Sequence, residues 1–336
     1  MSTAETDTQI INPEMPDVPP QAPSKINLKD YQKPSFAVET VDLDIKLYED
    51  HAQVASTLQM VRQSAGDLVL FGEDLALLAI TMNGESLPSE RYQHRAGKLT
   101  IADAPDDVTL EIQVRICPQT NTALEGLYMA GSGDDTMFVT QCEPEGFRKI
   151  TFYPDRPDVL AVFTTRLEAD KRYPTLLANG NLVEAGDVSG TADRHYAIWH
   201  DPTNKPSYLF ACVIADLDVL TDSYTTSEGR EVTLELYAKS ADIDKCDVGM
   251  QALKDAMRWD EVNYGRAYDL DRYMIVAVSQ FNMGAMENKG LNIFNTACVL
   301  SSPETTTDAR SFSVKSIIAH EYFHNWTGNR ITCRDW

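Results

Sequence analysis

From about residue 38 to residue 215, apolar and polar residues alternate along the chain with a period of two. The first clear run has four apolar residues at every second position: Val41, Leu43, Ile45 and Leu47. The same alternation returns over 108–116. Successive side chains of a strand point to opposite faces of a sheet, so this spacing predicts half-buried strands. Asn83-Gly84, between two apolar runs, predicts a hairpin, because a type I′ turn needs positive φ. We therefore expect segment 27–215 to form an antiparallel all-β domain, a sandwich or saddle.

The pattern changes after Asp216, where longer helical periods and continuous apolar runs replace the alternation. The expected elements are a helix, two buried strands and a second helix: 247–264, 273–278, 291–294, and a run through Ser311 towards Asn325. Gly265 marks the end of the first helix, and the polar residues 305–308 offer side-chain oxygens that can cap the second. We therefore expect a second, α+β domain over 216–336.

The ends, the charge and the cysteines limit the class of protein. Residues 1–26 are polar and rich in proline, without the basic start and apolar run of a secretory signal, so we expect a disordered leader. No stretch approaches the roughly 20 apolar residues that a membrane span needs. The net charge of −22 argues against a nucleic-acid partner. The six cysteines are scattered without a C-x-x-C pair, and with no secretory signal this favours reduced thiols in a cytoplasmic protein. No residue pattern bears on the oligomeric state, and a monomer is the default expectation.

The strongest chemical signal is His320-Glu321-Tyr322-Phe323-His324, which fits H-E-x-x-H. Residues four apart on a helix differ by about 40° in direction, so both imidazoles can hold one Zn²⁺. Glu321 lies about 100° round from His320, too far for a natural third ligand. It is well placed as a general base that takes a proton from water on the metal.

The alternative is a helix whose histidines pack or cap without a metal. Four apolar residues in and around the motif predict a helix buried on several sides: Ile317, Ile318, Phe323 and Trp326. Two imidazoles and a carboxylate would be costly to bury there without partners, which favours the metal hypothesis. A third ligand is not evident, because Asp335 is the one carboxylate after His324 and lies beyond the helix-breaking Gly328. A Glu on a following helix, past Trp336, is the remaining common solution.

A second motif, Gly284-Ala285-Met286-Glu287-Asn288, lies between the two strands expected in this half. Small residues let a backbone approach an extended peptide, which can pair with the loop like an added strand. The Glu287 carboxylate can then bind the α-ammonium of a peptide, which confines cleavage to the first peptide bond. By itself this segment could equally be a turn with a solvated glutamate.

Taken together, segment 281–290 (F-N-M-G-A-M-E-N-K-G) and segment 320–326 (H-E-Y-F-H-N-W) resemble the paired signature of M1 zinc aminopeptidases. The chain is similar to the N-terminal portion of bacterial-type members of this family from about residue 27 onward. The resemblance implies a thermolysin-like catalytic domain over 216–336, cut off before the family's third zinc ligand, a Glu, and its transition-state Tyr. It also implies that Gln141 and Glu143 help to form the pocket for the peptide's amino end.

These residues point to one functional hypothesis with open alternatives. The expected activity is hydrolysis of the N-terminal peptide bond of peptides with a free N-terminus, with one Zn²⁺ per complete site. Met283 is expected either to line the pocket for the first side chain or to belong to the core. The chain by itself is expected to be inactive. A non-catalytic peptide-binding or scaffold fragment is the alternative, and an epoxide hydrolase activity exists in the same superfamily.

Overall fold

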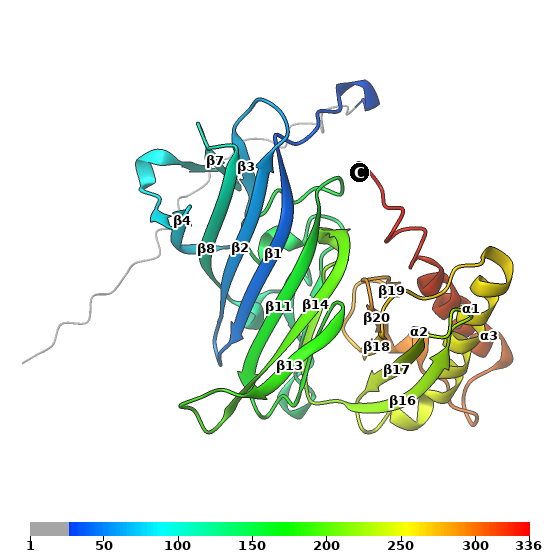
Figure 1. Cartoon of the computed structure of the whole chain (residues 1–336). Helices are drawn as coiled ribbons and strands as arrows, with labels where there is room; N and C mark the ends of the chain where they lie inside the picture. Colours follow the sequence, from blue (N-terminus) through cyan, green and yellow to red (C-terminus); the bar gives the residue numbers. More distant parts are fainter. Residues whose placement is uncertain (1–26) are drawn as a thin grey trace, which may run out of the picture. The chain divides into compact units, whose positions relative to one another are not determined.

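Figure 1 shows the computed structural model of the chain, which describes residues 27–336. The leader expected over 1–26 lies outside the described residues. Residues 27–33 belong to a first unit and contain one 3-10 turn, η1 (Leu28–Asp30). Residues 34–336 form a second unit that holds all the sheets and α-helices described below.

The largest sheet has eight strands in the order β13-β14-β11-β1-β2-β8-β4-β5. In chain order these are β1 (Phe36–Leu47), β2 (Ala52–Arg62), β4 (Ala76–Met82), β5 (Glu85–Ser86), β8 (Asp107–Ile116), β11 (Leu160–Asp170), β13 (Asn181–Asp187) and β14 (Arg194–Pro206). Neighbouring strands within this sheet run antiparallel to one another, except for β1 and β11, which are parallel. The mainly antiparallel β architecture predicted for this half of the chain is therefore confirmed.

The alternating pattern corresponds to the faces of these strands. The predicted apolar positions of β1 and β8 are at most 4% exposed, and polar residues between them face outward. Asn83 and Gly84 have φ of 54° and 80° and join β4 to β5, as the hairpin prediction requires. Burial of one face thus fixes the register of the sheet, because a slip by one residue would expose every apolar side chain.

Two smaller sheets complete the N-terminal half. A four-stranded sheet, in the order β12-β15-β10-β9, contains β9 (Gly126–Ala130), β10 (Met137–Gln141), β12 (Thr175–Ala178) and β15 (Cys212–Ala215). A three-stranded sheet, in the order β3-β7-β6, contains β3 (Leu68–Phe71), β6 (Gln93–Arg95) and β7 (Lys98–Ile101). Four fully buried rings meet largely edge to face: Phe147, Tyr153, Phe163 and Phe210. Because Phe147 belongs to the segment that follows β10, this cluster anchors the segment that contains Glu143.

The C-terminal half is built on a five-stranded sheet in the order β16-β17-β18-β20-β19. Its strands are β16 (Asp218–Thr225), β17 (Glu231–Ala238), β18 (Arg272–Val278), β19 (Ala285–Met286) and β20 (Leu291–Asn295). Its helices are α1 (Asp247–Tyr264), α2 (Thr296–Val299) and α3 (Asp308–Phe323). Figure 1 shows α1 and α3 lying together beside this sheet. Alternate residues of β18 explain the layering, since Ile275 packs with the helices whereas Met274 and Val276 join the core of the β half.

The predicted helix ends agree with the structure. α1 spans the predicted residues and ends at Gly265, whose φ of 63° is left-handed. Thr307 caps α3 by accepting a hydrogen bond from the Arg310 backbone N–H. Within residues 27–336, no helix combines the length and the apolar character required to cross a membrane. One of the two hydrophobic cores contains residues from both sides of the predicted boundary, for example Val41 and Met274, so the boundary at 215/216 stays a prediction.

The expectation that α3 is buried on several sides is wrong. Four of its residues are buried, all on the row that faces the sheet and α1: Val314, Ile318, Glu321 and Tyr322. Phe312 on the other side is 72% exposed, and Phe323 is 36% exposed. A cavity of about 600 Å³ opens between α1 and α3 and reaches His320. The apolar residues flanking the motif do not enclose the helix, because one row of side chains is enough to bury it against the sheet.

Replacing Phe147 by alanine is expected to lower the free energy of unfolding by about 3–5 kcal/mol, because the ring lies at the centre of the buried aromatic cluster. Urea denaturation measures the change. Leu182→Ala is the control, since Leu182 is 42% exposed and its loss should cost less than about 0.5 kcal/mol. Similar losses in the two variants would contradict this description of the core.

Candidate metal centre and active site

The structure brings the two predicted histidines together at the C-terminal end of α3. The Nε2 atoms of His320 and His324 are 3.0 Å apart, and the two rings meet edge to face. Two ligands of a tetrahedral zinc ion, each about 2.0–2.1 Å from the metal, lie about 3.3 Å from one another. The spacing of these nitrogens therefore suits one shared metal ion.

The turn after α3 fixes the protonation of His324. Its Nδ1 lies 2.7 Å from the backbone oxygen of Thr327. A carbonyl oxygen can only accept, so Nδ1 carries the proton and Nε2 keeps a free lone pair directed at His320. Gly328 makes this turn possible, because its φ is +137° and a Cβ there would lie 2.8 Å from His324 Nδ1. Its carbonyl accepts a hydrogen bond of 3.0 Å from the Tyr208 hydroxyl.

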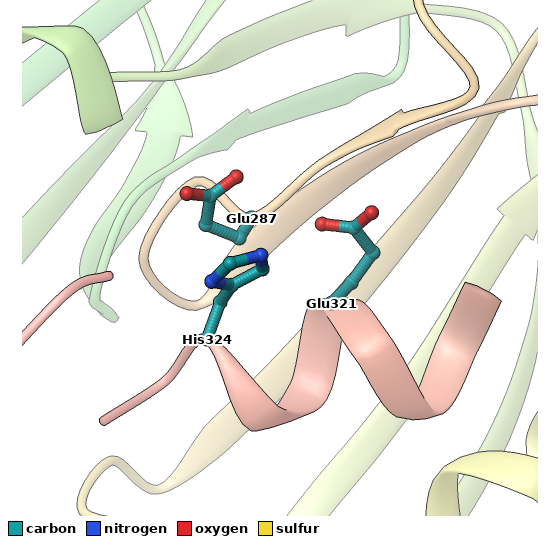
Figure 2. Close-up of side chains that lie close together, drawn as sticks. All are labelled: Glu287, Glu321 and His324. Carbon is teal, nitrogen blue, oxygen red and sulfur yellow. The ribbon is translucent and has the colours of Figure 1, made fainter. Parts of the chain in front are cut away.

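Acidic side chains share the space beside the histidines. Ligand atoms of Glu287, Glu321 and His324 all lie within 4.8 Å of one another. Figure 2 shows Glu321 rising from α3 and Glu287 from the loop beside it, with the His324 ring close to both. Burial, together with the nearby carboxylates of Glu287 and Glu143, raises the pKa of Glu321 to about 8. A bound cation would relieve both effects, so the arrangement suits a metal ion or an ammonium group.

The residues of the second motif, 284–288, differ in whether their side chains reach the acidic cluster. β19 pairs with β20 on one side and forms the edge of the five-stranded sheet. Gly284 precedes it, and its carbonyl accepts a hydrogen bond from the Asn295 backbone. The side chains of Met286 and Asn288 are fully buried, and Asn288 bonds to the carbonyl of Phe210 rather than facing the acidic cluster. Among the last three residues of the motif, the side chain of Glu287 faces the cluster.

The last residue of β10 and the loop after it bring a further acceptor and a further acid to the site. Gln141 is 3% exposed, and its Nε2 donates to the Glu143 backbone oxygen and to the Met283 sulfur, at 3.0 Å each. Its Oε1 is buried and finds no hydrogen-bond partner within residues 27–336. The pKa of Glu143 is raised by burial and by Glu287. Met283 is 39% exposed, which argues against a core role for it.

Sequence reasoning missed the polar residues that hold the two motifs together. They are Tyr208, Asp269, Lys289, Asn325 and Asn329. Lys289 and Asn325 each follow a motif directly, and a charged residue just before a buried strand is a usable signal. Asp335, considered as a ligand, is exposed and does not belong to the acidic cluster.

Comparison with known proteins confirms the family resemblance. Residues 31–209 match the Peptidase M1 N-terminal domain, and residues 248–336 match the Peptidase family M1 domain. The chain is 50% identical to the Aminopeptidase N of Caulobacter vibrioides over 317 residues and to that of Escherichia coli over 319 residues. Each alignment covers 94% of this chain and 36% of the relative.

A solved structure gives the same result for the fold. The crystal structure of Legionella pneumophila aminopeptidase A in complex with aspartic acid superposes with a TM-score of 0.86 at 36% sequence identity. The superposition covers 92% of this chain and 36% of that one, so the chain spans little more than a third of the length of these relatives. Because the N-terminal domain match alone extends over more than half of the 336 residues, the chain belongs to peptidase family M1.

Proposed function

We propose that this chain supplies the proton-transfer and amine-binding residues of a zinc aminopeptidase that hydrolyses the first peptide bond of peptides with a free N-terminus. The observation that carries the proposal is the convergence of Glu287, Glu321 and His324, with His320 beside them. The family of the chain supports the proposal, since two relatives that are 50% identical to it are named Aminopeptidase N. A cytoplasmic monomer that binds neither nucleic acid nor membranes is part of the same proposal.

His320 and His324 would hold the zinc ion through their Nε2 atoms. The residues fit the metal, because two ring nitrogens lie 3.0 Å apart and that of His324 has no proton to donate. When bound, zinc polarises a carbonyl group and lowers the pKa of water. Glu287 and Glu321 have other roles here, so a carboxylate outside residues 27–336 would complete the shell. On this proposal the 336-residue chain alone binds zinc weakly and is inactive.

Glu321 would act as the general base. Its carboxyl group is 7% exposed and lies one residue from His320, within reach of a water molecule between the imidazoles and the peptide. Without a cation its pKa is about 8, so the group is largely protonated at neutral pH. A neighbouring cation favours the ionised form, which brings the pKa towards the operating pH, where a base is most effective. Glu321 would take the proton from the attacking water and return it to the leaving amine.

Glu287, Glu143 and Gln141 would bind the α-ammonium of the peptide. An ammonium group has three N–H donors and no acceptor, and these three residues offer two carboxylates and one amide oxygen. The buried and unpartnered Oε1 of Gln141 needs a donor, which the ammonium would provide. The repulsion that raises the pKa of Glu143 would be relieved at the same time. This pocket would confine cleavage to the first bond, because an internal residue brings no charge to it.

The loop that carries Met283 and the edge strand β19 would guide the peptide chain. No strand within residues 27–336 pairs with the outer edge of Ala285–Met286, so an extended peptide backbone could add there as a further strand. Met283 lies beside Gln141 and is partly exposed, so it would line the pocket for the first side chain. Gly284 leaves room for the peptide backbone next to it.

Replacing Glu321 by glutamine in the complete gene product is expected to lower kcat for an amino-acid arylamide by about 100-fold or more, because the general base is lost. Zinc content should remain unchanged. Glu228→Gln, at an exposed turn, is the matched control and should behave like the wild type. Equal kcat values for wild type and Glu321→Gln would remove the general-base role.

Replacing Glu287 by glutamine is expected to weaken binding of free-amine peptides by about tenfold or more, because a charged hydrogen-bond acceptor is lost. Binding of N-acetylated peptides, which carry no ammonium, should be weak in both proteins and unaffected by the change. Calorimetric titration measures both affinities. Equal affinity of the wild type for free and acetylated peptides would instead support a non-catalytic peptide-binding module.

Gly328→Ala is expected to weaken zinc binding by about tenfold or more, because the added Cβ would displace His324. Competition with a chromophoric chelator measures the affinity. Gly229→Ala is the matched control, since Gly229 also has a positive φ of +83° but no atom near its Cβ position. Both variants carry the strain of a side chain at positive φ, whereas the clash with His324 is particular to Gly328→Ala. Unchanged zinc affinity in Gly328→Ala would refute the assignment of His324 as a ligand.

A further inference from the structure

A buried ammonium group lies between the two motifs. Lys289, two residues after Glu287, is 1% exposed. Its Nζ donates to Asp269 Oδ1 at 2.5 Å and to Asn325 Oδ1 at 2.7 Å. Asn325 follows His324 directly and is 3% exposed. One side chain therefore connects the loop of the acidic residue with the end of the metal-binding helix.

Further hydrogen bonds connect the loop that carries Glu287 with the turn that follows α3. Asn325 Nδ2 donates to the same oxygen of Asp269 at 3.3 Å, and Arg330 pairs with the other at 2.5 Å. Asn329 Nδ2 donates to the backbone oxygen of Glu287 at 3.0 Å, which ties the two segments a second time. The backbone of Glu287 is thus held from the turn after α3, on the side where Lys289 is anchored.

The β half of the molecule holds the same loop from the other side. Asn179 Nδ2 donates to the backbone oxygen of Lys289 at 2.8 Å. The Asn179 side chain also donates to the Leu209 carbonyl and accepts from the Ala211 N–H. The Asn179 amide therefore ties the backbone of Lys289 to the backbone of Leu209 and Ala211 in the β half. This contact fixes the backbone position from which the Lys289 ammonium reaches Asp269 and Asn325.

Stability alone does not account for a charge at this position. A buried ion pair costs desolvation energy, and apolar side chains of similar volume often replace such pairs without loss of stability. The Asp269 carboxylate is ionised, because Lys289 and its other partners lower its pKa although burial opposes this. What the charged pair offers beyond packing is a fixed geometry, since charged hydrogen bonds are short and directional.

We infer that Lys289 is a positioning residue, whose ammonium sets the distance between the Glu287 carboxylate and the His324 imidazole. The inference rests on the proposed function, in which Glu287 binds the peptide's amine and His324 binds zinc. If the two groups lose their fixed spacing, a peptide that reaches the metal no longer meets the carboxylate in the correct place. The direct consequence is weaker binding of the substrate's free amine.

Lys289→Met in the complete gene product tests this role, because methionine keeps much of the side-chain volume and removes the ammonium. KM for an alanine arylamide should rise about tenfold, as expected for a lost charged hydrogen bond, with kcat per zinc-loaded enzyme changing much less. A purely structural role would reduce the fraction of active enzyme and leave KM unchanged. Arg194→Met is the matched control, since it removes a largely buried ion pair with Glu168, between β14 and β11 of the large sheet, and it should not alter KM.

Hydrogen exchange supplies a readout that does not depend on activity. In Lys289→Met, amides of 284–290 and 324–330 should exchange faster than in the wild type, whereas those of β17 should not change. Unchanged KM and unchanged exchange would overturn the inference. A wild-type protein without hydrolytic activity would instead refute the proposed function, and exchange would still test the role of Lys289.

Asn325→Ala provides a second, milder variant in case Lys289→Met does not fold. It keeps the ion pair between Lys289 and Asp269 and removes only the bridge to the helix end. KM should rise in the same direction, and the double variant should show less than the sum of the two single effects, because both break one connection. Wild-type KM and exchange in Asn325→Ala, or fully additive effects, would also overturn the inference.

Discussion

The burial of acidic side chains close to one another is the constraint around which the site is built. Burial, together with repulsion from neighbouring carboxylates, raises the pKa of Glu321 and of Glu143. His324 shares this space with Glu287 and Glu321, and His320 lies next to His324. Such a cluster is unfavourable by itself, because each charge opposes the next in a partly buried setting. It becomes favourable when cations enter. A metal ion at the histidines and an ammonium group at the outer carboxylates would each neutralise part of it.

The fold holds this cluster by joining two cores across one sheet. The five-stranded sheet packs α1 and α3 on one face and the core of the β half on the other. α3 supplies His320 and Glu321, whereas the end of β10 and the loop after it, in the β half, supply Gln141 and Glu143. Tyr208 and Asn179 then reach from the β half to the turns that carry the motifs. The site therefore depends on both halves, although each motif belongs to one.

Much of the fold was predictable from local patterns. The period of two identified β1 and β8, and the helical spacing with Gly265 identified α1 to its last residue. These predictions succeed because burial of one face is a property of neighbouring residues in the sequence. The parallel pairing of β1 with β11 was not predictable, since strands more than 110 residues apart leave no local signal. The exposure of α3 was misjudged for a similar reason, because apolar flanks do not reveal what covers them.

In the candidate site, too, local geometry was predictable from the sequence, whereas contacts between distant segments were not. The spacing of H-E-x-x-H predicts that both histidines lie on one side of a helix, and the Nε2 atoms of His320 and His324 do lie close together. The pairing of Gln141 with Met283, and of Lys289 with Asn325, joins segments 142 and 36 residues apart. Asn288 was predicted to bind substrate, yet its buried side chain donates a hydrogen bond to the Phe210 carbonyl. Contacts of this kind emerge from tertiary packing and not from spacing along the chain.

Anomalous scattering at the zinc absorption edge, from crystals of the complete gene product grown with zinc, would locate the cation directly. A single strong peak about 2.0–2.1 Å from Nε2 of both His320 and His324, beside Glu321, is the result that the charge cluster predicts. Fully loaded crystals with no peak at these nitrogens, or with the two imidazoles turned apart, would contradict it.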